Sequence, residues 1–93
     1  MMIYSEENIS IAIKVLQNLY RPMYNVPIET LADAVLWDFD EDYQEHEGNS
    51  HFLNGVLVKE KFSEWLSAEI KFRKTEYGID YLSSMEEILH NNS

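Results

Sequence analysis

Residues 27–43, PIETLADAVLWDFDEDY, carry the pattern that decides the fold of this chain. A proline suits the first turn of a helix, because the N–H group that it lacks has no partner there. Apolar residues then recur every three or four positions, as they do on the buried side of an amphipathic helix. They are Ile28, Leu31, Ala32, Val35, Leu36, Phe39 and Tyr43. The pattern predicts a helix that begins near residue 27 and ends between residues 39 and 46.

A helix is also predicted before this stretch, over residues 5–20. Ser5 is a favoured N-cap residue, and two glutamates follow it where the helix dipole favours negative charge. The residues expected on its buried side are Ile9, Ala12, Ile13, Leu16, Leu19 and Tyr20. Pro22 cannot donate the next helical hydrogen bond, so a loop is expected between the first two helices.

Two more helices are predicted after it. The third runs from about residue 57 to about Phe72 and the fourth follows Gly78, and both have apolar residues at helical spacing. The positions at this spacing are Val58, Phe62, Trp65, Leu66 and either Glu69 or Ile70 in the third, and Ile79, Leu82, Met85, Ile88 and Leu89 in the fourth. Asn54-Gly55 is also a common hairpin turn, so a short hairpin around residues 51–58 is an alternative start to this region.

The length and composition indicate one mainly α-helical domain. Ninety-three residues give room for a single modest core, so residues 1–93 are expected to form one bundle of about four helices, with 91–93 as a frayed tail. No cysteine is present, which excludes disulfides and thiolate metal sites. No apolar run is long enough to cross a bilayer, and the chain starts with acids rather than with the basic region of a signal peptide. We expect a soluble, cytoplasmic protein with no membrane contact.

Charge is distributed unevenly within a net charge of −10. Residues 22–58 contain no lysine or arginine, and their acidic residues are Glu29, Asp33, Asp38, Asp40, Glu41, Asp42, Glu45 and Glu47. Residues 59–74 hold most of the basic residues of the chain, namely Lys59, Lys61, Lys71, Arg73 and Lys74. An acidic surface disfavours binding to a nucleic-acid backbone, which selects lysine and arginine. It favours a basic partner.

The spacing places Trp37 on the solvent side of the second helix, opposite the apolar stripe. One acidic flank holds Glu29, Asp33, Asp40 and Glu47, and the other holds Asp38, Glu41 and Glu45. A tryptophan between carboxylates is typical of an interface anchor. Two alternatives stay open: another segment covers Trp37, or the helix is irregular, since a continuous helix turns Asp42 toward the apolar side. The acidic run is also explained by a solvated face that keeps the protein soluble.

Metal binding and catalysis are not expected. Asp38, Asp40 and Asp42 have the spacing that begins an EF-hand loop, but Tyr43 stands where glycine is needed and Asn49 where the bidentate glutamate is needed. His46 and His51 beside acidic residues match no zinc motif. There is no glycine-rich phosphate loop and no nucleophile elbow, and the clustered carboxylates are expected to be exposed. We therefore expect no enzyme activity and no cofactor.

Three segments together resemble a winged-helix domain. They are ISIAIKVLQNLY (9–20), VPIETLADAV (26–35) and FRKTEYGIDYL (72–82), the last with the pattern T-x-x-G-x-x-x-L. The resemblance implies a recognition helix after the second helix. Here that segment is LWDFDEDYQEHEG (36–48), whose acidic residues disfavour reading DNA.

In size and charge the chain is similar to toxin-immunity proteins and to phage-encoded inhibitors of host defence, including anti-CRISPR proteins and DNA mimics. We therefore expect an inhibitor that binds a basic surface of a nucleic-acid-processing enzyme, such as a toxin nuclease or an anti-phage effector, and blocks its nucleic-acid groove. The residues expected to bind are Glu29, Asp33, Trp37, Asp38, Asp40, Glu41, Asp42, Tyr43, Glu45 and Glu47. The alternatives are a winged-helix-like regulator that contacts DNA through residues 59–74, and a module that associates with itself as a homodimer.

Overall fold

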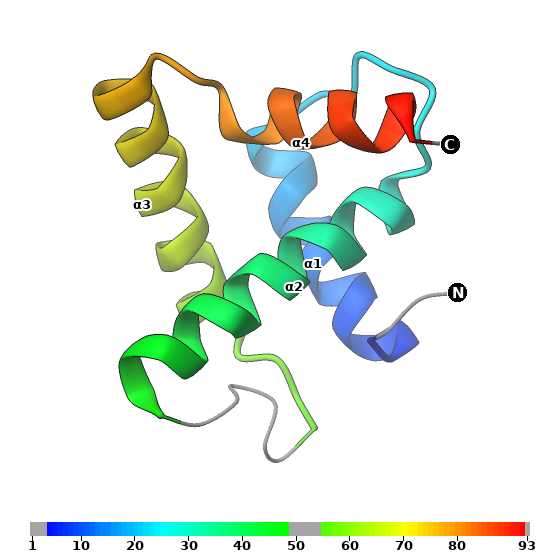
Figure 1. Cartoon of the computed structure of the whole chain (residues 1–93). Coiled ribbons are helices and arrows are strands. Elements are labelled where there is room, and N and C mark those ends of the chain that lie inside the picture. The colour runs from blue at the N-terminus through cyan, green and yellow to red at the C-terminus, as the bar shows by residue number, and fades with distance from the viewer. Residues whose placement is uncertain (1–3, 49–54, 93) are drawn as a thin grey trace.

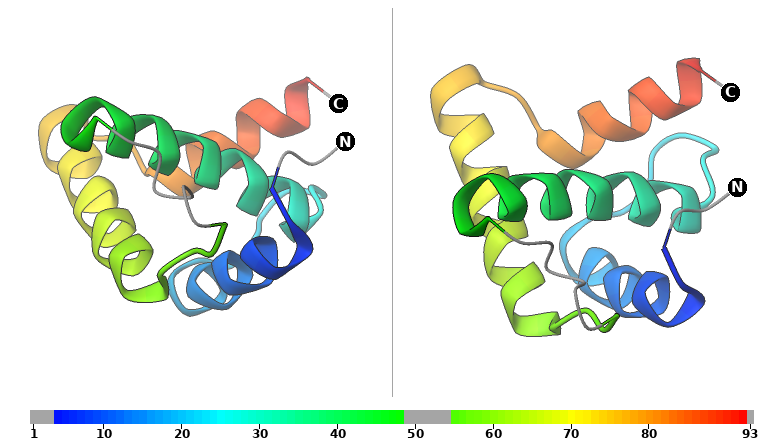
Figure 2. Two further views of the ribbon diagram at one scale, coloured as in Figure 1. Left: turned by 90° about the horizontal axis from the view of Figure 1, so that it is seen from below. Right: turned by 60° about the horizontal axis from the view of Figure 1, so that its bottom comes forward.

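The computed structural model describes residues 4–48 and 55–92, which form four α-helices joined by short connections. They are α1 (Glu6–Leu19), α2 (Ile28–Glu47), α3 (Lys59–Tyr77) and α4 (Tyr81–Asn91). The described residues contain no strand. Figure 1 shows α2 crossing the middle of the molecule, with α3 at one side and α4 across the top. The start of α1 and the end of α4 lie on the side away from α3, as the two views of Figure 2 also show. The predicted mainly α-helical bundle is confirmed.

The first two helices begin and end close to where the sequence predicts. The Ser5 hydroxyl accepts a hydrogen bond of 3.2 Å from the Asn8 backbone N–H, which caps α1. Pro27 lies just before α2, and its carbonyl accepts the N–H groups of Thr30 and Leu31. α2 then continues without interruption to Glu47 and ends at Gly48, which takes a left-handed conformation (φ 77°). The irregularity suggested by Asp42 is therefore absent from this helix.

The third and fourth helices differ from the prediction at their ends. α3 begins two residues after the predicted start and continues to Tyr77, five residues beyond the predicted end at Phe72. It stops only at Gly78, whose left-handed backbone (φ 67°) closes the helix. α4 starts after Asp80, whose carboxylate accepts the Ser83 N–H at 3.1 Å, and it includes Asn91, which the prediction placed in the tail.

One apolar core lies among the four helices, and α2 and α3 each contact all three other helices. The buried apolar residues are Ile9, Ala12, Val15, Leu16, Leu31, Ala32, Val35, Leu36, Phe39, Leu57, Phe62, Leu66, Tyr81 and Leu82. Aromatic rings join three of the helices: Trp65 of α3 lies 5.3 Å from Phe39 of α2 and 6.1 Å from Tyr81 of α4, centroid to centroid. Such pairs contribute beyond their buried area.

Four residues predicted on buried sides are exposed instead. Leu19, Val58, Ile79 and Ile88 lie at helix ends or on outer faces. In α4 the side that faces the core consists of Leu82, Met85, Glu86 and Leu89. The buried side of this helix therefore includes the carboxylate of Glu86 and does not include Ile88. Ile88, with 53% of its surface exposed, points away from the core.

Two buried polar side chains hold the connections against the helices. Glu86 is fully buried, and its carboxylate accepts hydrogen bonds from the Tyr20 hydroxyl and from the backbone N–H groups of Met23 and Tyr24. Asn8 donates through Nδ2 to the Gly55 carbonyl at 3.2 Å and accepts the Leu57 N–H at 2.9 Å. The loop after α1 and the segment before α3 are thereby fixed to α4 and α1.

The hairpin alternative falls partly outside the described residues, since it spans 51–58 and the description resumes at residue 55. Residues 55–58 form no strand, and Val58 is the N-cap residue of α3. Within the described part of the chain, no helix has the length and apolarity required to traverse a lipid bilayer.

Candidate functional site

The acidic run of α2 faces three directions because the helix is continuous. Asp38 and Asp42 turn toward α3 and α4, Asp33 and Asp40 turn toward Tyr4, and Glu41 and Glu45 are exposed. The sequence predicted that these carboxylates are exposed, except that a continuous α2 turns Asp42 toward the apolar side. The expected exposure is wrong for Asp33, Asp38 and Asp40, which like Asp42 are partly buried and hydrogen-bonded within the chain.

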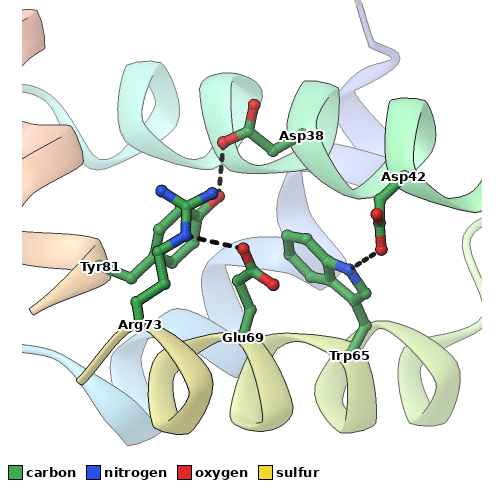
Figure 3. A network of polar contacts seen from close by, with 6 residues as sticks. All are labelled: Asp38, Asp42, Trp65, Glu69, Arg73 and Tyr81. Carbon is green, nitrogen blue, oxygen red and sulfur yellow. Dashed lines mark hydrogen bonds and ion pairs between the residues drawn. The ribbon is translucent and has the colours of Figure 1, made fainter. Parts of the chain in front are cut away.

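Asp38 and Asp42 form what we name the inner flank of α2. This flank joins α2 to α3 and α4 through hydrogen bonds from neutral donors, as Figure 3 shows. The Tyr81 hydroxyl donates to Oδ2 of Asp38 at 2.7 Å, and the Trp65 indole N–H donates to Oδ2 of Asp42 at 2.8 Å. A neutral donor holds a carboxylate in place without cancelling its charge. His46 Nδ1 also lies 3.6 Å from Oδ1 of Asp42. The inner flank is therefore both a helix–helix contact and a fixed source of negative potential.

Asp33 and Asp40 form the outer flank of α2, and the chain before α1 folds against it. The backbone N–H of Tyr4 donates to Asp33 at 3.2 Å, and the Tyr4 hydroxyl donates to Asp40 at 3.4 Å. Gln44 also donates to Asp40 at 3.4 Å. These contacts place Tyr4 beside Trp37, and both line a hollow of about 220 Å³ with Asp40, Glu41 and Gln44.

Both flanking tyrosines remain donors at neutral pH. Burial, followed by the hydrogen bond and negative charge of Asp38, raises the pKa of Tyr81 far above its ordinary value, although Arg73 opposes this effect. Burial and then Asp40 raise the pKa of Tyr4 in the same direction. Each hydroxyl therefore stays protonated at neutral pH and donates to its aspartate.

The exposed side of α2 carries what we name the acidic ridge, formed by Trp37, Glu41 and Glu45. Trp37 keeps 49% of its surface exposed, as the sequence spacing predicts, and both glutamates are exposed. Glu29 is exposed too, but it lies twelve residues before Glu41, about 18 Å along a helix. The side chain of Glu47 lies outside the described residues. The compact part of the predicted site is therefore the second half of α2.

Two hollows lie between α2 and α3, one on each side of the Asp42–Trp65 hydrogen bond, and these two residues line both. The acidic hollow has a volume of about 150 Å³ and is lined by Asp38, Glu41, Asp42, Glu45, Trp65, Glu69 and Arg73. The aromatic hollow has a volume of about 600 Å³ and is lined by Phe39, Asp42, Tyr43, His46, Lys61, Glu64 and Trp65. In the acidic hollow five carboxylates face one guanidinium, so the surface strongly favours an added cation.

The basic segment does not form one surface, because α3 separates its members. Lys59 and Lys61 lie at the start of the helix, whereas Lys71 and Lys74 lie near its end, and all four are exposed. Arg73 is engaged within the fold: its Nε donates to Glu69 at 2.8 Å, and its guanidinium lies 4.9 Å from the centre of the Tyr81 ring. The resulting chain of contacts, Asp38–Tyr81–Arg73–Glu69, connects α2, α4 and α3 (Figure 3).

The carboxylates of the calcium-like spacing diverge. Asp38 and Asp42 contact α4 and α3, while Asp40 contacts Tyr4 on the opposite flank. Among residues 4–48 and 55–92, no three histidine, aspartate or glutamate side chains gather closely enough to hold a metal ion. His51, the second histidine of the zinc alternative, lies outside these ranges.

The residues of α3 that line the two hollows were not predicted as part of the site. Trp65 was expected only in the core, and Lys61 and Arg73 were considered only as members of the basic segment 59–74. Glu64 and Glu69 were not among the expected site residues. A signal for Trp65 exists in the sequence, since an indole N–H that is partly buried needs an acceptor and Asp42 is the carboxylate that a continuous α2 turns inward. Pairing the two helices in the correct register requires the structure.

The winged-helix resemblance is limited to the order of helices. Residues 36–48, where a recognition helix is implied, continue α2 itself, and residues 72–82 are the end of α3, Gly78 and the start of α4. Comparisons of the chain with protein-family models, with curated proteins and with solved structures gave no match.

Proposed function

We propose that this chain is a small interaction protein that binds a basic surface of a nucleic-acid-processing enzyme and blocks its nucleic-acid groove. The observation that carries the proposal is the acidic ridge: an exposed tryptophan followed, one and two turns later, by exposed glutamates on a helix fixed by its flanking aspartates. The proposed role is binding without catalysis, in the cytoplasm, in the manner of immunity proteins and phage inhibitors such as anti-CRISPR proteins.

The charges of α2 support attraction of a basic partner. Asp38 and Asp42 accept hydrogen bonds from neutral groups, so their charges add to those of Glu41 and Glu45. A complementary field raises association rates about 10- to 1000-fold at low salt, and this gain falls as ionic strength rises. Carboxylates held on a rigid helix also resemble the phosphates that lysine and arginine side chains bind, which is the basis of DNA mimicry.

Trp37 supplies the apolar contact that charge alone lacks. Its half-exposed ring lies beside Glu41 and next to a hollow that also includes Tyr4. Tryptophan is enriched among residues that dominate binding energy, and surrounding polar groups that exclude water strengthen it. A partner surface with a groove for this ring and lysines or arginines around it fits the ridge.

A charge-reversal experiment tests the proposal. Glu41→Lys with Glu45→Lys changes the ridge, and Glu76→Lys with Glu87→Lys makes the same change in net charge at exposed positions outside α2. Each immobilised variant is used to capture basic proteins from a host lysate at low salt, and each captured enzyme is then assayed for nucleic-acid binding. We expect the wild type and the Glu76→Lys, Glu87→Lys variant to capture the enzyme, and the ridge variant not to capture it. We also expect the captured enzyme to have lost its binding to nucleic acid. Equal capture by the ridge variant contradicts the proposal.

A second candidate function is nucleic-acid binding through the end of α3. There Lys71 and Lys74 are exposed beside Phe72 and Tyr77, whose side chains are 50% and 65% exposed and whose rings meet at 5.8 Å. Exposed aromatic rings with basic neighbours suit stacking on bases. Binding of labelled duplex or single strands that is lost in Lys71→Gln with Lys74→Gln supports this candidate over the first.

Self-association is a third possibility, in which the acidic ridge of one copy meets the basic residues of α3 in another. Sizing by light scattering at low and high salt tests it. A homodimer of this kind is expected to dissociate as salt rises, and a monomer at high concentration and low salt excludes it.

A further inference from the structure

The aromatic hollow has the features of a site for a cationic side chain. Phe39, only 2% exposed, forms its floor, and the partly buried rings of Tyr43 and Trp65 stand beside it. Asp42 and Glu64 place carboxylates at its edge. Its volume of about 600 Å³ lies within the range of pockets that hold small ligands. Aromatic faces with nearby carboxylates are the surroundings that bind organic cations.

A cation of the chain itself already occupies one of these faces. Nζ of Lys61 lies 5.7 Å from the centre of the Tyr43 ring. This distance is close to the limit of about 6 Å for a cation–π contact, and the Lys61 side chain is exposed. The contact is therefore weak, and a cation with better geometry can replace it.

We infer that the aromatic hollow receives an arginine side chain from the basic partner, in place of Lys61. This inference rests on the proposed function. It names the chemical group of the partner that the aromatic hollow, beside the acidic ridge, recognises. A planar guanidinium stacks on aromatic rings and at the same time donates paired hydrogen bonds to carboxylates, which an ammonium group does not do. Tyr43 offers the ring, and Asp42 and Glu64 offer the acceptors.

The charges around the hollow favour this occupant. Within it, the carboxylates of Asp42 and Glu64 face the ammonium group of Lys61 and the imidazole of His46, whose Nδ1 lies 3.6 Å from Oδ1 of Asp42. On the far side of Asp42, the acidic hollow adds four more carboxylates against Arg73. Arg73 combines two of these contacts inside the fold, since its guanidinium lies over the Tyr81 ring while its Nε donates one hydrogen bond to Glu69.

The test is a titration followed by ¹H–¹⁵N NMR, with capped tetrapeptides of arginine, lysine and neutral citrulline as probes. The signal of the Trp65 indole N–H reports on the aromatic hollow, and that of the Trp37 indole N–H reports on the acidic ridge. The spectrum of Trp37→Phe assigns the two signals. We expect the arginine peptide to shift the Trp65 signal and to bind about three- to tenfold more tightly than the lysine peptide, as a partly desolvated stacking contact supplies. The citrulline peptide is expected not to bind.

Matched variants locate the site. Lys61→Gln removes the resident cation and is expected to strengthen arginine-peptide binding about two- to fivefold, whereas Lys59→Gln, the same change outside the hollow, is expected to have a smaller effect. Tyr43→Leu is expected to weaken binding about three- to tenfold and Tyr43→Phe to retain it, because phenylalanine keeps the ring face. Tyr77→Leu is the control at an exposed tyrosine. Thermal unfolding confirms that each variant is folded.

The outcomes separate this inference from the proposed function. Equal binding of arginine and lysine peptides, with shifts at Trp37 alone and no difference between Lys61→Gln and Lys59→Gln, overturns the arginine site and leaves the acidic ridge as the binding surface. Failure of both cationic peptides to bind at low salt overturns both proposals. A stronger Lys61→Gln complex together with a weaker Tyr43→Leu complex supports the site.

Discussion

The indole N–H of Trp65 in α3 donates a hydrogen bond of 2.8 Å to Asp42 in α2. This contact joins the most acidic helix to the helix with most of the basic residues, and it lies between the aromatic and acidic hollows. A carboxylate that the sequence places in a binding surface thus also holds two helices together. The stability of the fold and the shape of the candidate site depend on the same pair.

We predict that Asp42 and Trp65 stabilise the fold as a coupled pair. Asp42→Ala and Trp65→Phe each remove a hydrogen bond to a charged acceptor, so each is expected to lower the free energy of unfolding by about 1–3 kcal/mol. The double variant is expected to cost less than the sum, with a coupling of about 0.5–3 kcal/mol. Urea unfolding measures these values, with Glu45→Ala as the exposed control. Additive losses contradict the pairing.

The Asp38–Tyr81 contact gives a second prediction, at alkaline pH. Because the folded pKa of Tyr81 is raised, its contribution to stability is complete below the ordinary tyrosine pKa of about 10 and is lost as pH rises above it. The wild type is therefore expected to lose stability above pH 10 more steeply than Tyr81→Phe. Chemical unfolding at several pH values measures this, with Tyr77→Phe as the exposed control. Parallel pH profiles for wild type and Tyr81→Phe contradict the prediction.

The sequence predicts the helices well where the apolar pattern is regular. In α2 the stripe from Leu31 to Phe39 is buried as expected, and Trp37 is exposed on the opposite side. The predicted end of α3 was five residues too early because the apolar periodicity stops near Phe72. Residues 73–77 contain no helix breaker, so the helix continues through them. There only Gly78, which accepts a left-handed conformation, sets the boundary.

The polar contacts were beyond the sequence because they join residues far apart in the chain. Glu86 has a charged side chain, which predicts a surface position, yet it is buried because donors from Tyr20, Met23 and Tyr24 surround it. Asp42 was recognised as turning inward, but without its partner Trp65 this was taken as a sign of an irregular helix. Periodicity measures apolarity, and it does not identify hydrogen-bond partners.

Asn8 is predicted to control the segment before α3. Its amide donates to the Gly55 carbonyl and accepts the N–H of Leu57, a residue whose side chain is only 3% exposed. Asn8→Ala leaves these backbone groups unpaired and is expected to cost about 1–3 kcal/mol. Hydrogen exchange at the Leu57 amide is expected to accelerate, whereas Asn18→Ala, at an exposed position of α1, is expected to leave it unchanged. Unaltered protection of Leu57 in Asn8→Ala contradicts the role.

Glu86 is predicted to make the fold sensitive to acid. Burial raises the pKa of its carboxyl, but the hydrogen bonds from Tyr20, Met23 and Tyr24 outweigh burial, so that the folded pKa lies below the ordinary value of 4.5. A lowered folded pKa contributes stability that is present above the ordinary value and is lost as pH falls through the folded one.

Glu86→Gln keeps the size of the side chain but removes its charge, and it is expected to lower the free energy of unfolding at neutral pH by about 1–3 kcal/mol. Because the variant lacks the titrating group, the difference between the two proteins is expected to shrink as pH falls below 4.5. Urea unfolding across this pH range measures the difference, with Glu87→Gln as the exposed neighbour. A constant difference between wild type and Glu86→Gln at every pH contradicts the prediction, because it means that the pKa of Glu86 is the same in the folded and unfolded states.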